Sequence, residues 1–351
     1  MSATATNRIQ KRMLVRERLT LRRLSVTLVV LLVVLLLFAV IALTVGSERI
    51  GLDAILRIIV SELTGGRADT PAEQVSIITD IRLPRVLMAV VVGAALSVAG
   101  AAFQALLRNP LADPGILGIS SGSALGAIAA TIFAESIPVS RPIAAFIGAL
   151  ITMGIVYFIG QGRRGGSTER LILAGVIVNA FLSSIVIYLL TAASGPRLRS
   201  VFSWLIGDLG GEPDLLPVAA ALVALGIIII FINSRGLNLL MTGEQEALAL
   251  GVEVKRVQIA VYIAASLITG AGVAAGGAIG FVGLIIPHAV RLAGGSDNRL
   301  VIPGSALGGG AFLLFADTIA RTVIAPLEIH IGVITAFIGA PVFVYLLRRT
   351  S

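Results

Sequence analysis

The chain has 351 residues, of which 57% are hydrophobic and only 13% charged, and its formal net charge is +8. Soluble domains carry about 25% charged residues, so this composition excludes an ordinary soluble protein and is typical of a helical membrane protein. Cysteine is absent, which excludes disulfides, zinc–thiolate sites and cysteine catalysis. Histidine occurs only at His288 and His330, which is too few for a metal site built from histidines. We therefore expect no metal site, no cofactor and no catalytic residues.

Residues 1–25 form a polar, basic segment, with seven Lys and Arg against the single acid Glu17, and an apolar run follows at 26–45. A signal peptide would have an apolar core of about 7–15 residues and a small-residue cleavage site after it. This run is longer and lacks such a site. We predict a cytoplasmic tail at 1–25, an uncleaved first span, and one transmembrane domain over 26–349.

After a charged, amphipathic segment at 46–79, nine further apolar runs follow. They lie near 86–106, 115–134, 142–160, 171–192, 215–232, 257–275, 278–290, 303–320 and 330–347. A membrane-spanning helix needs about 20 residues, and only 278–290 is clearly short and interrupted by glycine, so a broken or re-entrant helix is an alternative there. The pattern predicts an all-α, polytopic membrane protein with ten spans and both termini on one side.

Charge distribution gives the orientation. With the N-terminus in the cytoplasm, the cytoplasmic segments hold 18 of the 27 Lys and Arg but 7 of the 19 Asp and Glu. Lys and Arg are enriched in cytoplasmic loops, so both termini are predicted to be cytoplasmic.

Small residues recur four apart in three of the predicted helices. The series are Gly93–Ser97–Ala101, Gly118–Gly122–Gly126 and Gly272–Gly276–Gly280. This spacing lets helix backbones approach closely inside a membrane. It predicts a tightly packed bundle and carries no information about what the protein handles.

The chain contains no phosphate-binding loop. Such a loop needs Gly-Lys-Ser/Thr at a helix start, and the two lysines, Lys11 and Lys255, follow Gln10 and Val254. The chain therefore does not hydrolyse ATP by that mechanism.

Polar side chains are rare within the apolar runs, where the candidates are Gln104, Asn179, Asp317 and Arg321. Ion-coupled transporters usually place ionisable groups inside the membrane, because their cost there requires a functional reason. Asp317 and Arg321 are four residues apart, which favours an i,i+4 ion pair on one helix face. For His288, beside Pro287, we expect a structural hydrogen bond rather than a proton relay. An ion-coupled secondary transporter is the alternative class, and the scarcity of ionisable residues within the apolar runs argues against it.

The longest cytoplasmic segment is 233–256. Asn-Ser-Arg-Gly ends the sixth span, and Thr242 with Gln245 three residues later resembles a capped helix start. Leu248, Ala249 and Val252 would form an apolar stripe, and Gly251 would end the helix. Such a helix rests on lipid or docks a soluble partner, and the acids Glu244, Glu246 and Glu253 favour a protein groove.

Five long motifs carry a family resemblance. They are IRLPRVL at 81–87, GAALSVAGAAFQALLRNPLADPGILGISSG at 93–122, GFVGLIIPHAVRL at 280–292, LFADTIAR at 314–321 and IGVITAFIGAPVF at 331–343. Together they resemble the FecCD-type permeases of bacterial ABC importers for iron-siderophores, haem and cobalamin. The resemblance covers nearly the whole chain after about residue 25.

The resemblance implies a type II ABC importer permease fold in the bacterial cytoplasmic membrane, and a homodimer with the translocation path at its interface. It implies an ATPase dimer on the cytoplasmic side and a substrate-binding protein on the other side. By the same resemblance, Arg82, Arg85 and Arg321 pair with acidic residues of the binding protein, although interfacial snorkelling is the alternative for the first two. The family's coupling helix matches Gly243, Glu244, Gln245, Glu246, Leu248, Gly251 and Val252.

The cargo does not follow from the residues. Siderophores are the commonest cargo of the family, so a ferric siderophore is expected, with haem or cobalamin as alternatives. Asn179, Ser183, Ser184 and Tyr188 of the fifth span are candidates for the path lining, without an assignment of the direction in which each faces.

Overall fold

The computed structural model describes residues 20–46, 48–66, 70–133, 139–161, 168–192, 197–211, 213–325 and 327–350, and all regular secondary structure in these ranges is helical. The ten predicted spans correspond to α2 (Leu21–Thr44), α5 (Leu83–Leu106), α6 (Ile119–Ile132), α7 (Arg141–Gln161), α8 (Thr168–Ala192), α10 (Leu216–Ile232), α13 (Val254–Gly276), α14 (Val282–Gly294), α15 (Asn298–Thr322) and α16 (Ile331–Thr350). Among the described residues, seven helices are long and apolar enough to cross a membrane, whereas α6, α14 and α16 contain shorter apolar helices. The prediction of an all-α, multi-span fold is confirmed. Most of the predicted tail lies outside the described residues.

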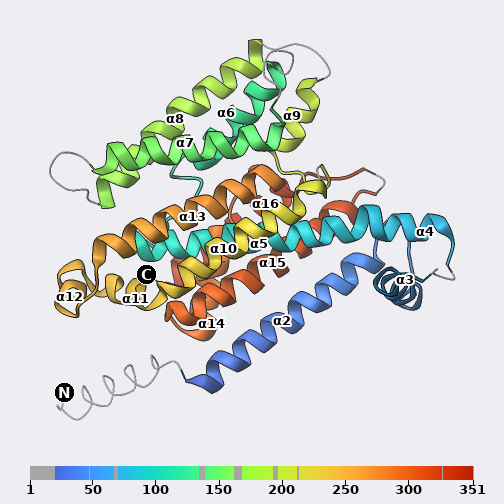
Figure 1. The fold of residues 1–351 in the computed structure, drawn as a ribbon, viewed down its shortest axis with the longest axis horizontal. Helices are drawn as coiled ribbons and strands as arrows, with labels where there is room; N and C mark the ends of the chain where they lie inside the picture. Colours follow the sequence, from blue (N-terminus) through green and yellow to red (C-terminus); the bar gives the residue numbers. More distant parts are fainter. Residues whose placement is uncertain are drawn as a thin grey trace.

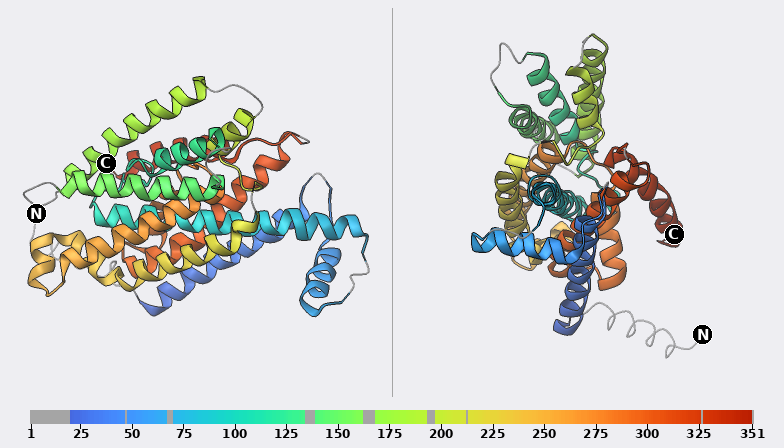
Figure 2. Two further views of the ribbon diagram at one scale, coloured as in Figure 1. Left: turned by 45° about the horizontal axis from the view of Figure 1, so that its top comes forward. Right: turned by 90° about the vertical axis from the view of Figure 1, so that its right-hand side faces the viewer.

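Helices α5, α13 and α15 form the centre of the bundle (Figure 1). In its most apolar window α5 is 83% buried, whereas the peripheral α2 is only 17% buried. Helices α6, α7 and α8 form a separate layer above α13, and the turned views in Figure 2 show the same grouping. This layer contacts α13 where Phe146 and Ala149 of α7 pack against Gly270.

Glycine contacts explain the tight centre. A Cβ atom on Gly93 of α5 would lie 2.3 Å from the carbonyl oxygen of Gly309 on α15, so the two backbones touch. A Cβ on Gly126 of α6 would likewise lie 2.1 Å from the carbonyl oxygen of Ala144 on α7. Close backbone approach through small residues is the packing that the four-residue spacing predicts, and it is confirmed at these positions.

The helix that contains α5 begins earlier than predicted. It runs from Ala72 to Leu106 through α4 (Ala72–Ser76) and a π-helical turn, η1 (Ile77–Arg82). Pro84 would normally end or kink a helix, because it lacks an N–H and clashes with the preceding turn. Here the N–H of Leu83 reaches back to the carbonyl of Ile78, and this wider turn accommodates the proline.

The segment between α5 and α6 is more than a simple turn at the end of α5. A Cβ on Gly283 would lie 2.8 Å from the Leu96 carbonyl oxygen and 3.1 Å from Pro114, so Pro114 returns to the level of Leu96. Leu96 is ten residues before the end of α5, which corresponds to about 15 Å of helix. Irregular backbone at membrane depth is tolerated because protein surrounds it, and α6 is shorter than predicted for this reason.

Helix α14 has 13 residues, with Pro287 inside it. At about 1.5 Å per residue it is shorter than the roughly 30 Å hydrocarbon layer. It is preceded by Phe281 in the left-handed region, at a φ of 70°. This agrees with the broken-helix alternative for 278–290.

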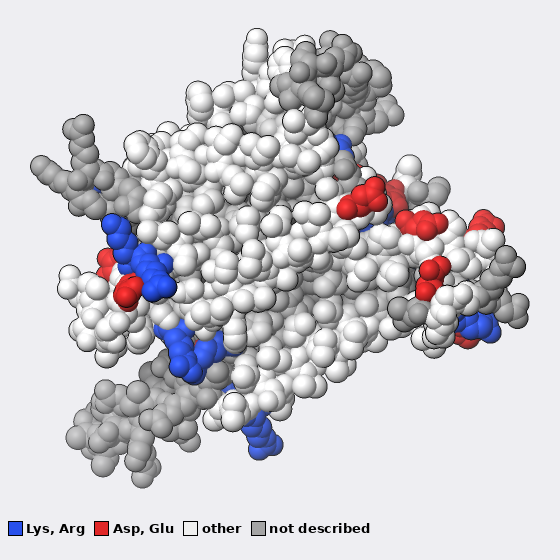
Figure 3. All heavy atoms as spheres, viewed as in Figure 1, with Lys and Arg blue, Asp and Glu red and all other residues white. Residues whose placement is uncertain are grey.

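The two ends of the bundle differ in charge. Helices α3 (Leu52–Thr64) and α4 lie at one end, and α11 (Ser234–Thr242) and α12 (Glu244–Ala249) lie at the other (Figure 1). Asp and Glu side chains gather at the α3–α4 end, and Lys and Arg gather toward the α12 end (Figure 3). The C-terminal end of α16 and the start of α2 lie toward the α12 end. We call the α3–α4 end the acidic end and the α12 end the basic end.

Candidate functional site

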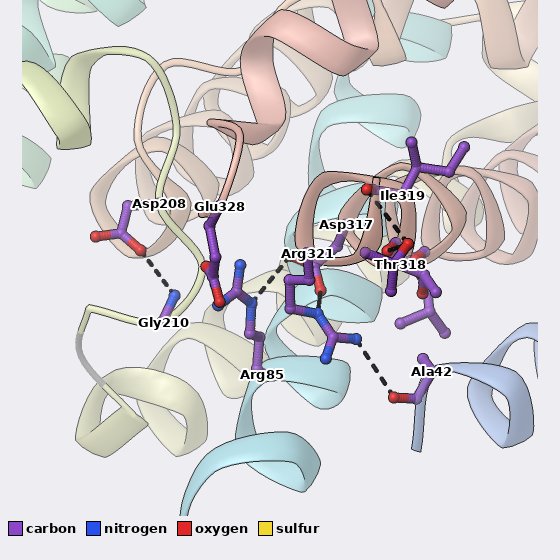
Figure 4. A network of polar contacts seen from close by, with 11 residues as sticks. Ala42, Arg85, Asp208, Gly210, Asp317, Thr318, Ile319, Arg321 and Glu328 are labelled. Atoms are coloured by element: carbon purple, nitrogen blue, oxygen red, sulfur yellow. Dashed lines mark hydrogen bonds and ion pairs between the residues drawn. The ribbon is translucent and has the colours of Figure 1, made fainter. Parts of the chain in front are cut away.

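A buried carboxylate organises the acidic end (Figure 4). Asp317 of α15 has a side chain with 0% exposure, and each of its oxygens accepts one arginine Nε–H. Arg85 of α5 donates to Oδ1 at 3.0 Å and Arg321 of α15 donates to Oδ2 at 2.9 Å. The second bond is the predicted i,i+4 pair. The first bond joins two helices and was not predicted.

Arg85 has a second acidic partner. Its Nη1 donates to Oε2 of Glu328 at 2.9 Å, in the connection between α15 and α16. The Glu328 side chain is 52% exposed, whereas that of Arg85 is 15% exposed. Arg85 therefore bridges a buried acid and an accessible one.

Arg82 is more deeply enclosed than the other two arginines. It is 4% exposed, and its Nη1 donates to the carbonyl oxygen of Leu43 at 2.7 Å. Its Nη2 donates to the Glu48 carbonyl. These contacts fix the chain that leaves α2. Arg82 is therefore a structural anchor of that connection.

The three predicted docking arginines lie close together at the acidic end. Arg321 Nη2 donates to the carbonyl oxygen of Ala42 at 3.3 Å, next to the Leu43 carbonyl that Arg82 holds. All three guanidinium groups already have partners within the chain. A carboxylate from another protein would therefore have to join or replace an internal partner.

The predicted coupling residues lie at the basic end, around the short helix α12. Glu244, Gln245, Glu246 and Leu248 are exposed on α12, while Ala247 is fully buried. Gly243 joins α11 to α12 at a φ of 146°, a conformation that favours glycine. Gly251 and Val252 follow α12 and lead into α13.

Thr242 does not cap α12, so that part of the prediction was wrong. Its hydroxyl donates to the Leu239 carbonyl oxygen at 2.8 Å and belongs to the last turn of α11. Gly243 occupies the cap position instead. Its carbonyl accepts the N–H of Ala247 at 3.1 Å.

A groove of about 660 Å³ lies beside α12, at the start of α13. Its lining combines exposed charge with apolar side chains: Leu248, Glu253, Val254, Lys255, Arg256, Ile259 and Ala260. An apolar floor with a charged rim is the arrangement found in protein-docking sites.

The candidate path residues of α8 divide between two faces. Asn179 and Ser183 face α6, where the Ser121 hydroxyl donates to Asn179 Oδ1 and lies 3.2 Å from Ser183 Oγ. Ser184 and Tyr188 lie on the exposed face of α8, and Tyr188 is 68% exposed. Ser184 and Tyr188 are therefore more accessible from outside the single chain than the partly buried Asn179 and Ser183.

A polar cluster inside the bundle was not predicted as a cluster, although Gln104 was among the polar candidates. Gln104 donates to the carbonyl oxygens of Gly283 and Leu284, at 3.1 and 3.4 Å, and accepts from Arg291. Asp113 lines a nearby cavity of about 190 Å³. The polarity of Gln104 within an apolar run was the available signal. Arg291 gave none, because it reads as a cytoplasmic charge.

The long apolar helices of the bundle define the class as a polytopic helical membrane protein. The chain belongs to the FecCD transport family, whose sequence profile matches residues 31–349. It is a multi-pass inner-membrane permease subunit of the ABC importer class, and such subunits are not enzymes.

Two relatives have names that state what they transport. The chain is 42% identical to the hemin transport system permease protein HmuU of Yersinia pestis over 276 residues, which is 77% of this chain and 82% of the relative. It is 44% identical to the cobalamin import system permease protein BtuC of Halobacterium salinarum over 273 residues, 78% of this chain and 73% of the relative.

A solved structure described as an inward-facing conformation of a metal-chelate type ABC transporter superposes with a TM-score of 0.79. The two chains are 31% identical, and the match covers 92% of this chain and 98% of the other. The predicted permease fold is therefore confirmed.

Proposed function

We propose that the chain forms the membrane path of an importer for a chelated metal, and that a ferric siderophore is the cargo. Membership of the FecCD transport family carries this proposal. The likeness to a metal-chelate type transporter supports the cargo class, while the names of the relatives favour haem or cobalamin as alternatives. Both termini are proposed to be cytoplasmic, with the acidic end outside.

The test for cargo is ligand binding by the binding protein of the same transport system. Ferric siderophores, haem and cobalamin would be titrated separately, and uptake by proteoliposomes would be measured with the preferred ligand. Binding of haem or cobalamin alone would refute the siderophore assignment. Gradient-driven uptake by the chain without an ATPase would refute the importer itself.

At the acidic end, we propose that the binding protein docks through Arg85 and Arg321, with Arg82 holding the adjoining connection. The argument rests on the exposure of the acids that pair with Arg85. Glu328 is half-exposed and can leave, whereas Asp317 is fully buried. An acidic side chain of the partner would take the place of Glu328 on Arg85, while Asp317 keeps both arginines in position.

At the basic end, we propose that a soluble ATPase dimer docks on the segment Gly243–Val252. Its exposed acids and Leu248, which is 55% exposed, support a protein groove as the partner surface. Leu248→Glu should abolish co-purification of the ATPase. The matched control is Leu21→Glu at the start of α2, which is 83% exposed toward the same end.

A second copy of the chain would complete the path along the exposed face of α8. Ile177, Phe181 and Tyr188 on this face are 59%, 65% and 68% exposed, and Ser184 lies among them. The chain has no native cysteine, so single-cysteine cross-linking has no background. Tyr188→Cys should give a cross-linked dimer in membranes. Ala149→Cys, at a fully buried position, should not.

A further inference from the structure

One side chain joins the coupling segment to the core of the bundle. Asn238 lies in the middle of α11, and its Nδ2 donates to Asp297 Oδ1 at 2.8 Å. Its Oδ1 accepts from the backbone N–H of Asn298 at 2.8 Å and from the Asn298 side chain at 2.9 Å. The amide of Asn238 thus donates to the residue that caps α15 and accepts from the first residue of that helix.

The receiving end of this joint is rigid. Asp297 caps α15, because its Oδ1 accepts the N–H of Arg299 at 2.9 Å, and it also pairs with the Arg299 side chain. Burial acts to raise the pKa of Asp297, but hydrogen bonds from Arg299 and Asn238 lower it below its usual range. The carboxylate is therefore charged, and Asn298 beside it is fully buried.

Helix α11 is also tied to α12. Gly243 alone separates the two helices, so a displacement of α12 acts directly on α11. On α11, the apolar neighbours Leu237 and Leu240 are 0% and 3% exposed and pack into the core. Apolar contacts are non-directional and tolerate sliding, whereas three directional hydrogen bonds at Asn238 do not.

Beyond the joint, α15 reaches the opposite end of the molecule. Its 25 residues correspond to about 37 Å of helix, enough to cross the hydrocarbon layer. Asn298 begins it, and Asp317 near its end holds Arg85 and Arg321. A shift received at Asn298 therefore moves the arginine cluster.

We propose that Asn238 is the positioning residue that passes the displacement of α12 to α15, and so links the ATPase surface to the binding-protein surface. This inference rests on the proposed docking at Gly243–Val252. It concerns the step after docking, which can fail separately. Reciprocity between the two surfaces follows, because a coupling free energy acts equally in both directions.

The test compares binding-protein affinity with and without ATP in the reconstituted complex of permease, ATPase and binding protein. The ratio of the two dissociation constants measures the coupling. In the Asn238→Ala variant, this ratio should lie closer to one than in the wild type by a factor of about five or more. A factor of about five is the lower limit of typical coupling between two sites. ATPase co-purification and basal ATP hydrolysis should stay as in the wild type, which a merely structural defect would not allow.

The matched control is Asn233→Ala, because the Asn233 amide donates to the Ile229 carbonyl oxygen one turn earlier, at 2.8 Å. Should Asn238→Ala fail to assemble, Asn298→Ala replaces it. That variant loses the side-chain bond but keeps the backbone N–H bond to Asn238, and it should give an intermediate ratio.

Two results would overturn the inference: a wild-type ratio near one, or an Asn238→Ala ratio equal to that of the wild type. Failure of the ATPase to bind the wild-type segment would instead refute the docking proposal.

Discussion

Removing the carboxylate of Asp317 should destabilise the protein strongly. The side chain is fully buried and holds two guanidinium groups whose side chains are 15% and 9% exposed. Breaking a buried ion pair by removing one partner costs about 3–5 kcal/mol, because the remaining charge is left uncompensated. Glu328 still pairs with Arg85 in the variant, whereas Arg321 loses the carboxylate with which it pairs. We expect Asp317→Ala to lower the free energy of unfolding by about 3–5 kcal/mol.

Asp317→Asn separates charge from volume. The amide oxygen can accept a hydrogen bond from one arginine Nε–H, but the amide NH₂ group, itself a donor, would face the other Nε–H. At least one charge-assisted hydrogen bond is therefore lost, a cost of roughly 1.5–3 kcal/mol. Unfolding in mixed micelles can be followed by fluorescence of Trp204, which is the single tryptophan and is 3% exposed.

Asp80→Asn removes an exposed carboxylate near the same end, which accepts hydrogen bonds only from the hydroxyl groups of Ser76 and Thr79 among the described residues, and it should change the unfolding free energy by about 1 kcal/mol or less. An Asp317→Asn variant as stable as Asp80→Asn would refute the reasoning. A double-mutant cycle that combines Asp317→Asn with Arg321→Gln should show a substantial coupling energy, because the two side chains are in direct contact. A coupling energy near zero would also refute the reasoning.

Three further predictions concern single side chains. Glu328→Gln should raise binding-protein affinity by up to about fivefold, because a half-exposed pair contributes only about 0.2–1 kcal/mol. Glu73→Gln, the same charge change on exposed α4, should leave the affinity unaltered. Gly309→Leu should prevent the protein from eluting as a monodisperse gel-filtration peak, because a Cβ at this position would lie 2.2 Å from the Gly93 carbonyl oxygen. Gly154→Leu should be tolerated, because a Cβ there would have open space around it. Asp297→Asn should destabilise the chain at pH 7. Because the folded-state pKa of Asp297 is lowered, this difference should begin to shrink as pH falls below about 4 and should vanish only below the folded-state pKa.

The sequence contains enough to predict the helices and the distinction between the ends. Apolar runs of span length are rarely anything but membrane helices, and Lys and Arg bias the ends that they occupy. The placement of the arginines together at one end agrees with their predicted common side. The motif around Gly243–Val252 likewise indicated a short exposed helix, although the first helical residue is Glu244 and the cap is Gly243.

What the sequence could not predict depends on partners distant along the chain. The partners of Arg82 are backbone carbonyls of Leu43 and Glu48, and a carbonyl group has no residue-type signature. Asn238 reads as an ordinary helix residue, because Asp297 and Asn298 lie about sixty positions away. The return of Pro114 to the level of Leu96 is equally invisible, since hydropathy records composition and not depth.

Both candidate docking regions meet on the same pair of helices. Asp297 and Asp317 stand near the two ends of α15, and each carboxylate is held by an arginine of the chain. Between them, the backbone of α15 touches that of α5 at Gly309 and Gly93, so neither helix can slide past the other without separating. Motion between the two ends must therefore carry α5 and α15 together as one body. Helix α13 connects this pair to the α6–α8 layer: Gly272 of α13 lies against Ala95 of α5, and Gly270 lies against Phe146 and Ala149 of α7, so the layer is held through side chains and not through a backbone contact like that of Gly93 and Gly309.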